Sequence, residues 1–323
     1  MNRPVAVVLG APADRPPPGI ETAGTHVELR FAPDAESLCS RIAEAEACLA
    51  WRPRGEWLRR AWPQATGLRW IQSASDGVDG LLFPELVGSD VEVTNARGVF
   101  EDDIAEWVVG AMLAFATGIL RQRDAQSRAT WDPQTRERLA GTRLVVVGPG
   151  PIGRAVARRA RALGVAVSAV GRTARDTDAD FDRVEAVGGL HRAVADADWV
   201  LDALPLTAAT RHLFDAAAFG AMSRVTRFLN VGRGATVDEQ ALVAALGAGE
   251  IAGAALDVFE QEPLPATSPL WAMPHVLLSP HVCGDVEGWE RAVVELFVDN
   301  CARFARGEAL RNPVDKGAGF GVG

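Results

Sequence analysis

The stretch that decides the fold is Leu144-Val145-Val146-Val147-Gly148-Pro149-Gly150-Pro151-Ile152-Gly153-Arg154-Ala155-Val156-Ala157. Its apolar start predicts a buried parallel strand, and the small and apolar residues that follow are spaced as in a helix continuing to residue 163. Between them lies a G-x-G-x-x-G turn. Gly148 allows the tight turn, Gly150 lets the backbone approach a pyrophosphate, and Gly153 lets the helix pack closely on the strand. The N–H groups that open the helix then face the anion.

The surroundings of this motif favour a dinucleotide site over an ordinary glycine-rich turn. A strand precedes the motif, a helix follows it, and residues 166–170 supply a second strand. We therefore predict a dinucleotide cofactor held by the turn residues Gly148, Gly150, Pro151, Ile152 and Gly153.

The end of the second strand indicates which dinucleotide is bound. An NAD site usually carries Asp or Glu about 20 residues after the glycine motif, but here the strand ends in Gly171-Arg172-Thr173-Ala174-Arg175 and the first acid is Asp176. A guanidinium and a hydroxyl suit a phosphate group. We predict NADP(H) as the preferred cofactor, with Arg172 and Thr173 on the 2′-phosphate and Arg175 as a further candidate. The alternative is that Arg172 stacks on the adenine and that NAD(H) is used as well.

The composition sets the broad class of protein. A chain of 323 residues with 48% hydrophobic residues suits two domains with full cores. The net charge of −9 and the pI of about 5.2 predict no nucleic-acid partner. No apolar run reaches membrane length and no signal peptide is evident, so we expect a cytoplasmic protein without membrane association. The cysteine spacings suit no metal site, which predicts reduced thiols at Cys39, Cys48, Cys283 and Cys301.

The order of predicted elements gives the domain organisation. Residues 1–98 alternate strands and helices, which predicts a flavodoxin-like α/β unit. A helix capped by Asp102 or Asp103 and running through Ile104, Val108, Met112, Phe115 and Ile119 then connects to the nucleotide-binding domain. A long helix over residues 286–306 returns to the first domain. The predicted fold is α/β, with two doubly wound parallel-sheet domains. The substrate domain covers 1–98 plus 285–323, and a Rossmann dinucleotide-binding domain covers 99–284.

Three segments that follow strands of the nucleotide-binding domain carry polar residues. They hold Arg233 within residues 230–239, Glu260 and Glu262 within residues 256–265, and His281 within residues 279–285. Taken singly, each has an ordinary explanation: a surface Arg paired with Asp238, a solvated acidic loop, and a structural histidine. Ligands of open α/β sheets bind beyond the carboxyl ends of the strands, so together the segments predict one site.

These segments also belong to a longer series of motifs. The chain resembles the D-isomer-specific 2-hydroxyacid dehydrogenases over essentially its whole length, through residues 75–79, 95–106, 148–153, 204–207, 230–239, 256–265 and 279–284. The Trp271-Ala272-Met273-Pro274 run and the segment that ends in Gly284-Asp285 are most similar to the glyoxylate/hydroxypyruvate reductase branch.

The resemblance implies a catalytic trio. Arg233 would bind the substrate carboxylate and polarise the keto oxygen, His281 would protonate that oxygen, and Glu262 would orient His281. A carboxylate within hydrogen-bond reach raises the pKa of an imidazole by about 1–3 units, which keeps it a proton donor near neutral pH.

The resemblance implies further binding residues. Backbone N–H groups of Ser75, Asp76 and Gly77 would hold the substrate carboxylate, although the family usually has a small apolar residue where this chain has Asp76. Either Asp76 points to solvent or the substrate carries a group that welcomes it. Trp51 and Arg52 would line the pocket and Trp289 would close it, with ordinary packing and a surface charge as the alternative. On the cofactor, Asp257 would contact the nicotinamide carboxamide, and the remaining contacts would come from Leu204, Pro205, Val231 and Gly284.

The function expected from this resemblance is reduction of a short 2-oxo acid, of the glyoxylate or hydroxypyruvate type, to the D-2-hydroxy acid. A homodimer formed through residues 104–121 and their neighbours is also implied. One alternative is a dinucleotide-sensing co-repressor on the same fold, and another is a dehydrogenase for a larger 2-oxo acid. Formate dehydrogenase ranks low, because that branch has Gln where this chain has Glu262.

Overall fold

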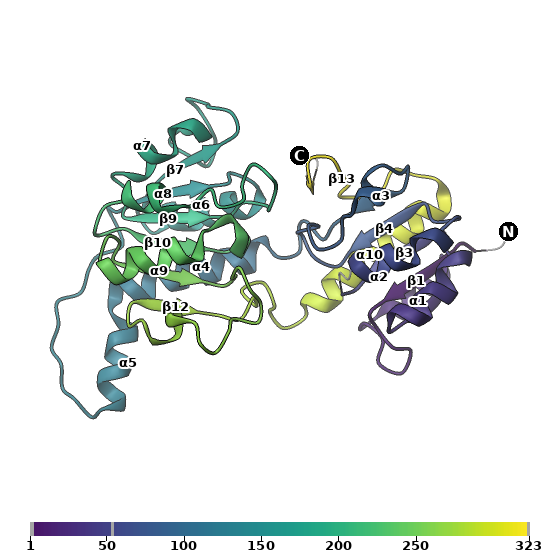
Figure 1. The fold of residues 1–323 in the computed structure, drawn as a ribbon, viewed down its shortest axis with the longest axis horizontal. Helices are drawn as coiled ribbons and strands as arrows, with labels where there is room; N and C mark the ends of the chain where they lie inside the picture. The colour runs from purple at the N-terminus through teal and green to yellow at the C-terminus, as the bar shows by residue number, and fades with distance from the viewer. Residues whose placement is uncertain (1–2, 53–54, 322–323) are drawn as a thin grey trace. The chain divides into compact units, whose positions relative to one another are not determined.

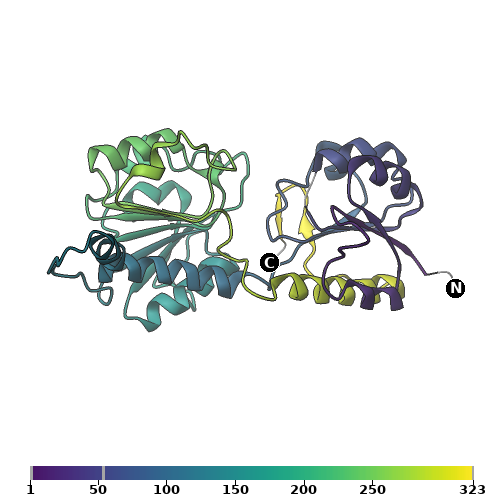
Figure 2. The same cartoon turned by 90° about the horizontal axis from the view of Figure 1, so that it is seen from below.

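The computed structural model describes residues 3–52 and 55–321. Its internal contacts divide the chain into two compact units (Figures 1 and 2): unit 1 comprises Met1–Phe100 and Glu287–Gly323, and unit 2 comprises Glu101–Val286. Each unit contains a parallel sheet with helices. The predicted fold class, two doubly wound parallel-sheet α/β domains, is therefore confirmed.

Unit 1 is built on a five-stranded parallel sheet with the order β2-β1-β3-β4-β5. This 2-1-3-4-5 order is that of flavodoxin-like folds. Strands β3 and β4 are buried along their whole length, as expected for a parallel sheet covered on both faces. The strands are β1 (Val5–Leu9), β2 (Glu28–Ala32), β3 (Ala47–Ala50), β4 (Trp70–Ser73) and β5 (Glu92–Thr94).

Helices cover both faces of this sheet (Figure 2). Successive side chains of a strand point to opposite faces, so Trp70 packs on Phe297 and Phe304 of α10, whereas Ile71 joins the core beneath α1 and α2. The helices are α1 (Ala35–Arg41), α2 (Gly55–Ala61), α3 (Pro84–Val87) and α10 (Trp289–Arg306), with 3-10 turns η1 (Ile20–Thr25), η2 (Ile42–Glu44) and η3 (Trp62–Gln64). The chain ends in a small hairpin of β13 (Val314–Asp315) and β14 (Phe320–Gly321).

Unit 2 is built on a seven-stranded parallel sheet with the order β12-β11-β10-β9-β6-β7-β8. The strand order reverses between β6 and β9, and this is the point at which open α/β sheets bind their ligands. The strands are β6 (Arg143–Val147), β7 (Ala166–Gly171), β8 (Val184–Ala186), β9 (Trp199–Asp202), β10 (Arg227–Asn230), β11 (Gly253–Leu256) and β12 (Val276–Leu278).

Helices also lie on both sides of the unit 2 sheet (Figure 2). The apolar core that joins α7, α8 and α9 to the sheet is centred on Phe214, Phe219 and Phe228, and α4 packs on α6. The helices are α4 (Glu101–Thr117), α5 (Ile119–Ser127), α6 (Pro151–Ala162), α7 (Leu190–Val194), α8 (Ala216–Gly220) and α9 (Glu239–Ala248). The 3-10 turns are η4 (Val187–Gly189), η5 (Gly234–Thr236) and η6 (Pro269–Ala272).

Three predicted helix features are wrong. The predicted helix from residue 104 to residue 119 is two helices, because Gly118 adopts a left-handed conformation with φ 69° between α4 and α5. Helix α4 begins at Glu101, so Asp102 and Asp103 lie in its first turn and are not caps. Helix α10 begins at Trp289 and not at residue 286, because Gly288 precedes it with φ 93°.

Within the described ranges, no single helix is both long and apolar enough to cross a membrane. The pair α4 and α5, bent by 65°, passes the same test jointly on length and composition alone. The cytoplasmic location expected from the sequence stays a prediction.

Candidate active site

The glycine turn between β6 and α6 is tightly packed at two glycines and open at the third. Gly148 has φ 104°, and a Cβ atom there would lie 2.6 Å from the Ala203 carbonyl oxygen. A Cβ atom at Gly153 would collide with the Gly148 carbonyl oxygen. Around Gly150, by contrast, a Cβ atom would meet nothing within 4 Å. Helix α6 opens at Pro151 without an acid in its first turn. The turn is thus closed where it packs and open where an anion would approach the helix N-terminus.

The residues predicted to choose the dinucleotide follow β7 directly. Strand β7 ends at Gly171, and the next residues, Arg172 and Thr173, are exposed. In the described chain, no carboxylate stands between Gly171 and Arg175. This donor set fits a phosphate on the adenosine ribose.

The carboxyl ends of β9 and β10 lie on the other side of the switch point. The Leu204 N–H donates to Asp202 Oδ1 at 3.0 Å, and the Val231 N–H donates to the Asp202 carbonyl oxygen at 3.1 Å. Leu204 and Pro205 are half-buried, and Val231 is buried. These three predicted cofactor residues therefore lie together.

Asp202 was not predicted from the sequence, although it connects two segments of the site. Its side chain is fully buried, and burial raises the pKa of its carboxyl to about 7. Oδ2 accepts a hydrogen bond from Thr236 Oγ1 at 2.5 Å, while Oδ1 accepts from the Leu204 N–H. An acid at the end of the apolar run Trp199–Asp202 was the signal that could have identified it.

Arg233 stands at the start of η5, in a turn with a fixed backbone. Its carbonyl oxygen accepts hydrogen bonds from Asn230 Nδ2 at 3.2 Å and from the Thr236 N–H at 3.1 Å. Its Nη1 donates to the Gly232 carbonyl oxygen at 2.7 Å. A Cβ atom at Gly234 would collide with the Phe259 carbonyl group, so this turn lies directly against the segment that carries the acids.

His281 and Glu262 meet in the structure. His281 Nδ1 lies 2.8 Å from Glu262 Oε2, and Glu262 Oε1 accepts the Phe259 N–H at 3.0 Å. The hydrogen bond to Glu262 raises the pKa of His281 above its ordinary value, against the effect of burial. Burial acts to raise the pKa of Glu262, but the hydrogen bonds from His281 and Phe259 outweigh it and lower that pKa. Each partner thus favours the charged form of the other.

The loop that carries His281 is organised by Asp257, whose side chain is fully buried. Asp257 Oδ1 accepts from the Val282 N–H at 2.9 Å and from Ser279 Oγ at 2.5 Å, and the Cys283 N–H lies 3.2 Å from both carboxylate oxygens. The His281 N–H donates to the Asp257 carbonyl oxygen at 2.8 Å. The Asp257 carboxylate, predicted on the nicotinamide, is engaged with this loop.

Two other predicted residues lie near this loop and the acidic segment. Gly284 is buried at the end of the loop that Asp257 organises. Glu260 is exposed, as expected for a solvated acidic segment, but it also pairs with His212 Nε2.

In unit 1, the predicted carboxylate-binding loop follows the carboxyl end of β4. Ser75 Oγ donates to the Gly77 carbonyl oxygen at 2.8 Å, which closes the loop on itself. Asn95 Nδ2 lies 2.7 Å from the Asp76 carbonyl oxygen and 2.9 Å from Asp76 Oδ1. The Asp76 carboxylate is therefore engaged with an amide of its own unit, which neither alternative for this residue foresaw.

Aromatic rings lie at the same end of the unit 1 sheet. Trp51, directly after β3, stacks on Trp289 at the start of α10, with ring centroids 5.7 Å apart and planes within 8°. Phe100 contacts Trp289 with ring centroids 5.9 Å apart. Both tryptophans are half-buried, whereas Arg52 is exposed. The predicted pocket residues Trp51 and Arg52 are thus adjacent in the chain but differ in their surroundings.

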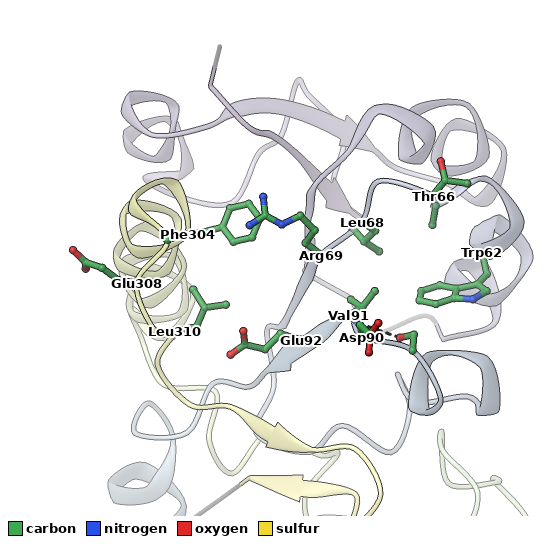
Figure 3. A pocket seen from close by; sticks show the side chains of 13 residues that line it. Trp62, Thr66, Leu68, Arg69, Asp90, Val91, Glu92, Phe304, Glu308 and Leu310 are labelled. Carbon is green, nitrogen blue, oxygen red and sulfur yellow. Dashed lines mark hydrogen bonds between the residues drawn. The ribbon is translucent and has the colours of Figure 1, made fainter. Parts of the chain in front are cut away.

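A separate cavity of about 640 Å³ in unit 1 lies at the opposite ends of these strands (Figure 3). Arg69, directly before β4, and Glu92, the first residue of β5, line it together with Trp62 and Phe304. Open α/β sheets bind ligands beyond the carboxyl ends of their strands. This cavity lies at the amino ends and is not part of the candidate site.

The order of motifs and the geometry of the glycine turn agree with a match to a known family. Residues 109–283 match the NAD-binding domain of the D-isomer-specific 2-hydroxyacid dehydrogenases. The chain belongs to this family. The predicted family and enzyme class, an NAD(P)-dependent D-2-hydroxyacid dehydrogenase, are confirmed.

Relatives with named activities share this assignment. Glyoxylate/hydroxypyruvate reductase B of Salmonella schwarzengrund strain CVM19633 is 34% identical over 256 residues, which span 77% of this chain and 79% of that protein. A D-isomer-specific 2-hydroxyacid dehydrogenase of Xanthobacter autotrophicus Py2, solved with NADPH and MES, is 30% identical with a TM-score of 0.79, over 98% of this chain and all of that one. The NADPH-dependent glyoxylate/hydroxypyruvate reductase of Sinorhizobium meliloti, solved with NADP and sulfate, is 27% identical with a TM-score of 0.83, over 99% of this chain and all of that one.

Proposed function

We propose that this chain reduces a short 2-oxo acid, of the glyoxylate or hydroxypyruvate type, to the D-2-hydroxy acid and that it prefers NADPH. The observation that carries the proposal is the contact between His281 Nδ1 and Glu262 Oε2 at 2.8 Å, beside the carboxyl ends of strands in unit 2. A proton donor whose charged form is favoured by a neighbouring carboxylate suits a reaction that develops negative charge on oxygen.

The roles of the trio follow from the chemistry of each side chain. His281 donates its Nε2 proton to the substrate keto oxygen, because Glu262 occupies Nδ1 and so orients the ring. Arg233 binds the substrate carboxylate and stabilises the negative charge that grows on the keto oxygen. A guanidinium suits both roles, because it has several N–H donors and stays positively charged at every pH at which the enzyme works. When bound, the nicotinamide supplies a hydride to the carbonyl carbon.

The cofactor-binding residues proposed for this chain divide into two groups. The turn from Gly148 to Gly153 holds the pyrophosphate at the N-terminus of α6. Arg172 and Thr173 hold the 2′-phosphate, and their exposure directly beyond β7 supports that role. The relatives solved with NADPH and NADP support the same preference. NAD(H) remains the second cofactor to test.

The substrate class is proposed from unit 1 and from the names of the relatives. The Ser75, Asp76 and Gly77 loop keeps its role in carboxylate binding, because Asn95 engages the Asp76 carboxylate and so reduces its repulsion of a bound anion. Trp51 and Trp289 present large apolar rings at the same end of the sheet. A short 2-oxo acid is the substrate that requires least room beside such rings.

A homodimer formed through α4, α5 and their neighbours completes the proposal. This region exposes apolar side chains, with Trp131 94% exposed, Ile119 55% exposed and Leu113 36% exposed. Exposed apolar side chains on connected segments of the chain are candidates for burial in an interface. Sedimentation equilibrium of the intact chain tests this point, and a monomer at micromolar concentration would contradict it.

The experiment that tests the function is a set of initial rates with NADPH and with NADH. The substrates are glyoxylate, hydroxypyruvate, pyruvate, phenylpyruvate and oxaloacetate. We expect turnover of the short acids with NADPH, and a loss on the order of 10²–10⁴ in kcat for His281→Asn. Turnover of bulky acids alone would favour a dehydrogenase for a larger 2-oxo acid. Tight dinucleotide binding without any turnover would favour a dinucleotide-sensing binding protein.

A further inference from the structure

Ion pairs connect the dinucleotide helix α6 to the loop that follows β7. Arg154 on α6 donates from Nη1 to Asp178 Oδ1 at 2.7 Å and from Nη2 to Asp178 Oδ2 at 2.9 Å. Nη1 also donates to Asp180 Oδ2 at 2.9 Å. Two parallel bonds between a guanidinium and one carboxylate fix orientation as well as position. The loop is therefore fastened to the helix that opens the pyrophosphate site.

Asp178 also binds a second arginine, Arg175. Arg175 Nη2 donates to Asp178 Oδ2 at 3.2 Å, so one carboxylate oxygen lies between the Arg154 and Arg175 guanidinium groups. The Asp178 side chain is only 7% exposed. The hydrogen bond from Arg154 is the main reason that the pKa of Asp178 is well below its usual range. Asp178 therefore stays a carboxylate and keeps both partners.

Arg175 is also fixed through its backbone. Its N–H donates to the Val184 carbonyl oxygen at 2.8 Å, and its carbonyl oxygen accepts the Val184 N–H at 2.9 Å. Between these residues lies Phe181, which is buried with its ring 5.3 Å from the Arg154 guanidinium carbon. The Arg175 side chain is 43% exposed and so stays accessible to a ligand.

The charges of this network matter for an anion that binds nearby. Arg154 pairs with Asp178 and, together with Arg158, with Asp180, so Arg175 is not the sole cationic partner of Asp178. Without Arg154, Asp178 would have Arg175 as its ion-pair partner, and its charge would draw Arg175 away from a phosphate and repel that phosphate. Arg175 lies three residues after Arg172, on the segment assigned to the 2′-phosphate.

We propose that Arg154, acting through Asp178, holds Arg175 at the 2′-phosphate of the cofactor and thereby helps to set the preference for NADP(H) over NAD(H). Arg154 is then a positioning residue, and Arg175 is the member of this network that contacts the 2′-phosphate beside Arg172 and Thr173. This proposal rests on the proposed cofactor. It adds Arg154, on helix α6, to the residues of the loop after β7 that determine cofactor specificity.

The test measures binding of two fragments that differ only in the 2′-phosphate, adenosine 2′,5′-bisphosphate and 5′-AMP, by calorimetry. The intact proteins compared are the wild type, Arg154→Met, Arg175→Met and the double variant. We expect Arg154→Met to weaken 2′,5′-bisphosphate binding on the order of tenfold and to leave 5′-AMP binding within about twofold. In the Arg175→Met background, Arg154→Met should have no further effect, because the relay from Arg154 through Asp178 to Arg175 has lost the residue that contacts the phosphate.

Arg158→Met is the matched control. Arg158 lies on the same helix and carries the same charge, but among the described residues its ion pair is with Asp180, at 3.5 Å, and not with Asp178. We expect Arg158→Met to leave both affinities within about twofold of the wild type. If Arg154→Met does not fold, Arg154→Lys serves in its place, because lysine keeps the charge but cannot form two parallel bonds.

Three results would overturn the relay: equal weakening of both fragments, an effect of Arg154→Met that persists without Arg175, or an equal effect of Arg158→Met. A wild type that binds both fragments equally would instead show that the proposed cofactor preference is wrong, and the relay would fall with it.

Discussion

His281 Nδ1 lies 2.8 Å from Glu262 Oε2, and the two residues come from loops that follow different strands of the unit 2 sheet. Each loop is fixed independently of the other residue of the pair. Glu262 Oε1 accepts the Phe259 N–H, and the His281 N–H donates to the Asp257 carbonyl oxygen. The contact therefore depends on the sheet, which places both loops at one edge, and on Asp257, which joins the two loops by hydrogen bonds. Its consequence is a raised pKa for His281, caused mainly by the hydrogen bond to Glu262.

Replacing Glu262 with glutamine should move the pH profile of the reduction. The reaction needs protonated His281, so the rate falls as pH rises through the pKa of that group. Glutamine keeps an acceptor for the Phe259 N–H but removes the charge that raises the pKa of His281, so the fall should begin at lower pH. The measurement is kcat/KM for the 2-oxo acid as a function of pH. An unchanged midpoint would show that Glu262 does not set the titration.

Replacing Arg233 with lysine tests whether the planar guanidinium is required. Lysine keeps one positive charge but presents it as a point, without two parallel donors. We expect both a higher KM for the 2-oxo acid and a kcat lower by about 10²-fold or more, because the charge on the keto oxygen grows in the transition state. Arg224→Met is the control, because Arg224 is exposed just before β10, at the other end of the strand. A change in KM alone would limit Arg233 to substrate binding.

The periodic and motif-bearing parts of the chain were predictable from the sequence. The apolar run before Gly148 and the apolar segment Gly253–Leu256 are typical of buried parallel strands, and both are strands in the structure. The contact of Glu262 with His281 was expected from the resemblance, and the structure gives its distance. Three short strands were not predicted: β8 has three residues, one of them Glu185, and β13 and β14 have two each.

The partners of polar side chains were the least predictable part. The engagement of Asp76 with Asn95 joins residues 19 positions apart, and that of Arg154 with Asp178 spans 24 positions. Neither pair follows a helical or strand spacing that the sequence would reveal. Both depend on how loops close after their strands, which local propensity does not determine.

Lys316, the only lysine of the chain, should be important for the stability of unit 1. Its Nζ donates to three carbonyl oxygens, of Leu86 at 3.1 Å, Ser89 at 2.6 Å and Val91 at 2.8 Å. An ammonium group has three donors, and methionine would leave these carbonyl groups without them. We expect Lys316→Met to lower the free energy of unfolding by about 1–3 kcal/mol, measured in urea. Arg60→Met, at an exposed position of α2, is the control and should change it by less than about 0.5 kcal/mol.

Replacing Asp202 with asparagine should make stability less dependent on pH. Burial raises the pKa of Asp202 to about 7 in the folded chain, whereas an unfolded Asp titrates near pH 4, at about 3.9. The folded state thus binds the Asp202 proton more tightly than the unfolded state does. Below the unfolded pKa, Asp202 therefore does not lower the free energy of unfolding, but it lowers it increasingly as pH rises towards about 7. Asparagine keeps an acceptor for the Leu204 N–H and gives the Thr236 hydroxyl a donor, without the charge.

Asp202→Asn should therefore unfold at a higher urea concentration than the wild type at about pH 8. The free energies of unfolding of the two proteins should converge towards about pH 5. We expect the gap between these free energies to change by on the order of 1–4 kcal/mol over this range. Asp196→Asn is the matched control, because the Asp196 side chain is 87% exposed, and its gap to the wild type should not vary in this way. If the gap for Asp202→Asn were constant with pH, the carboxyl would have the same charge in the folded and unfolded chains. Asp202 would then connect Leu204 and Thr236 by hydrogen bonds without making stability depend on pH.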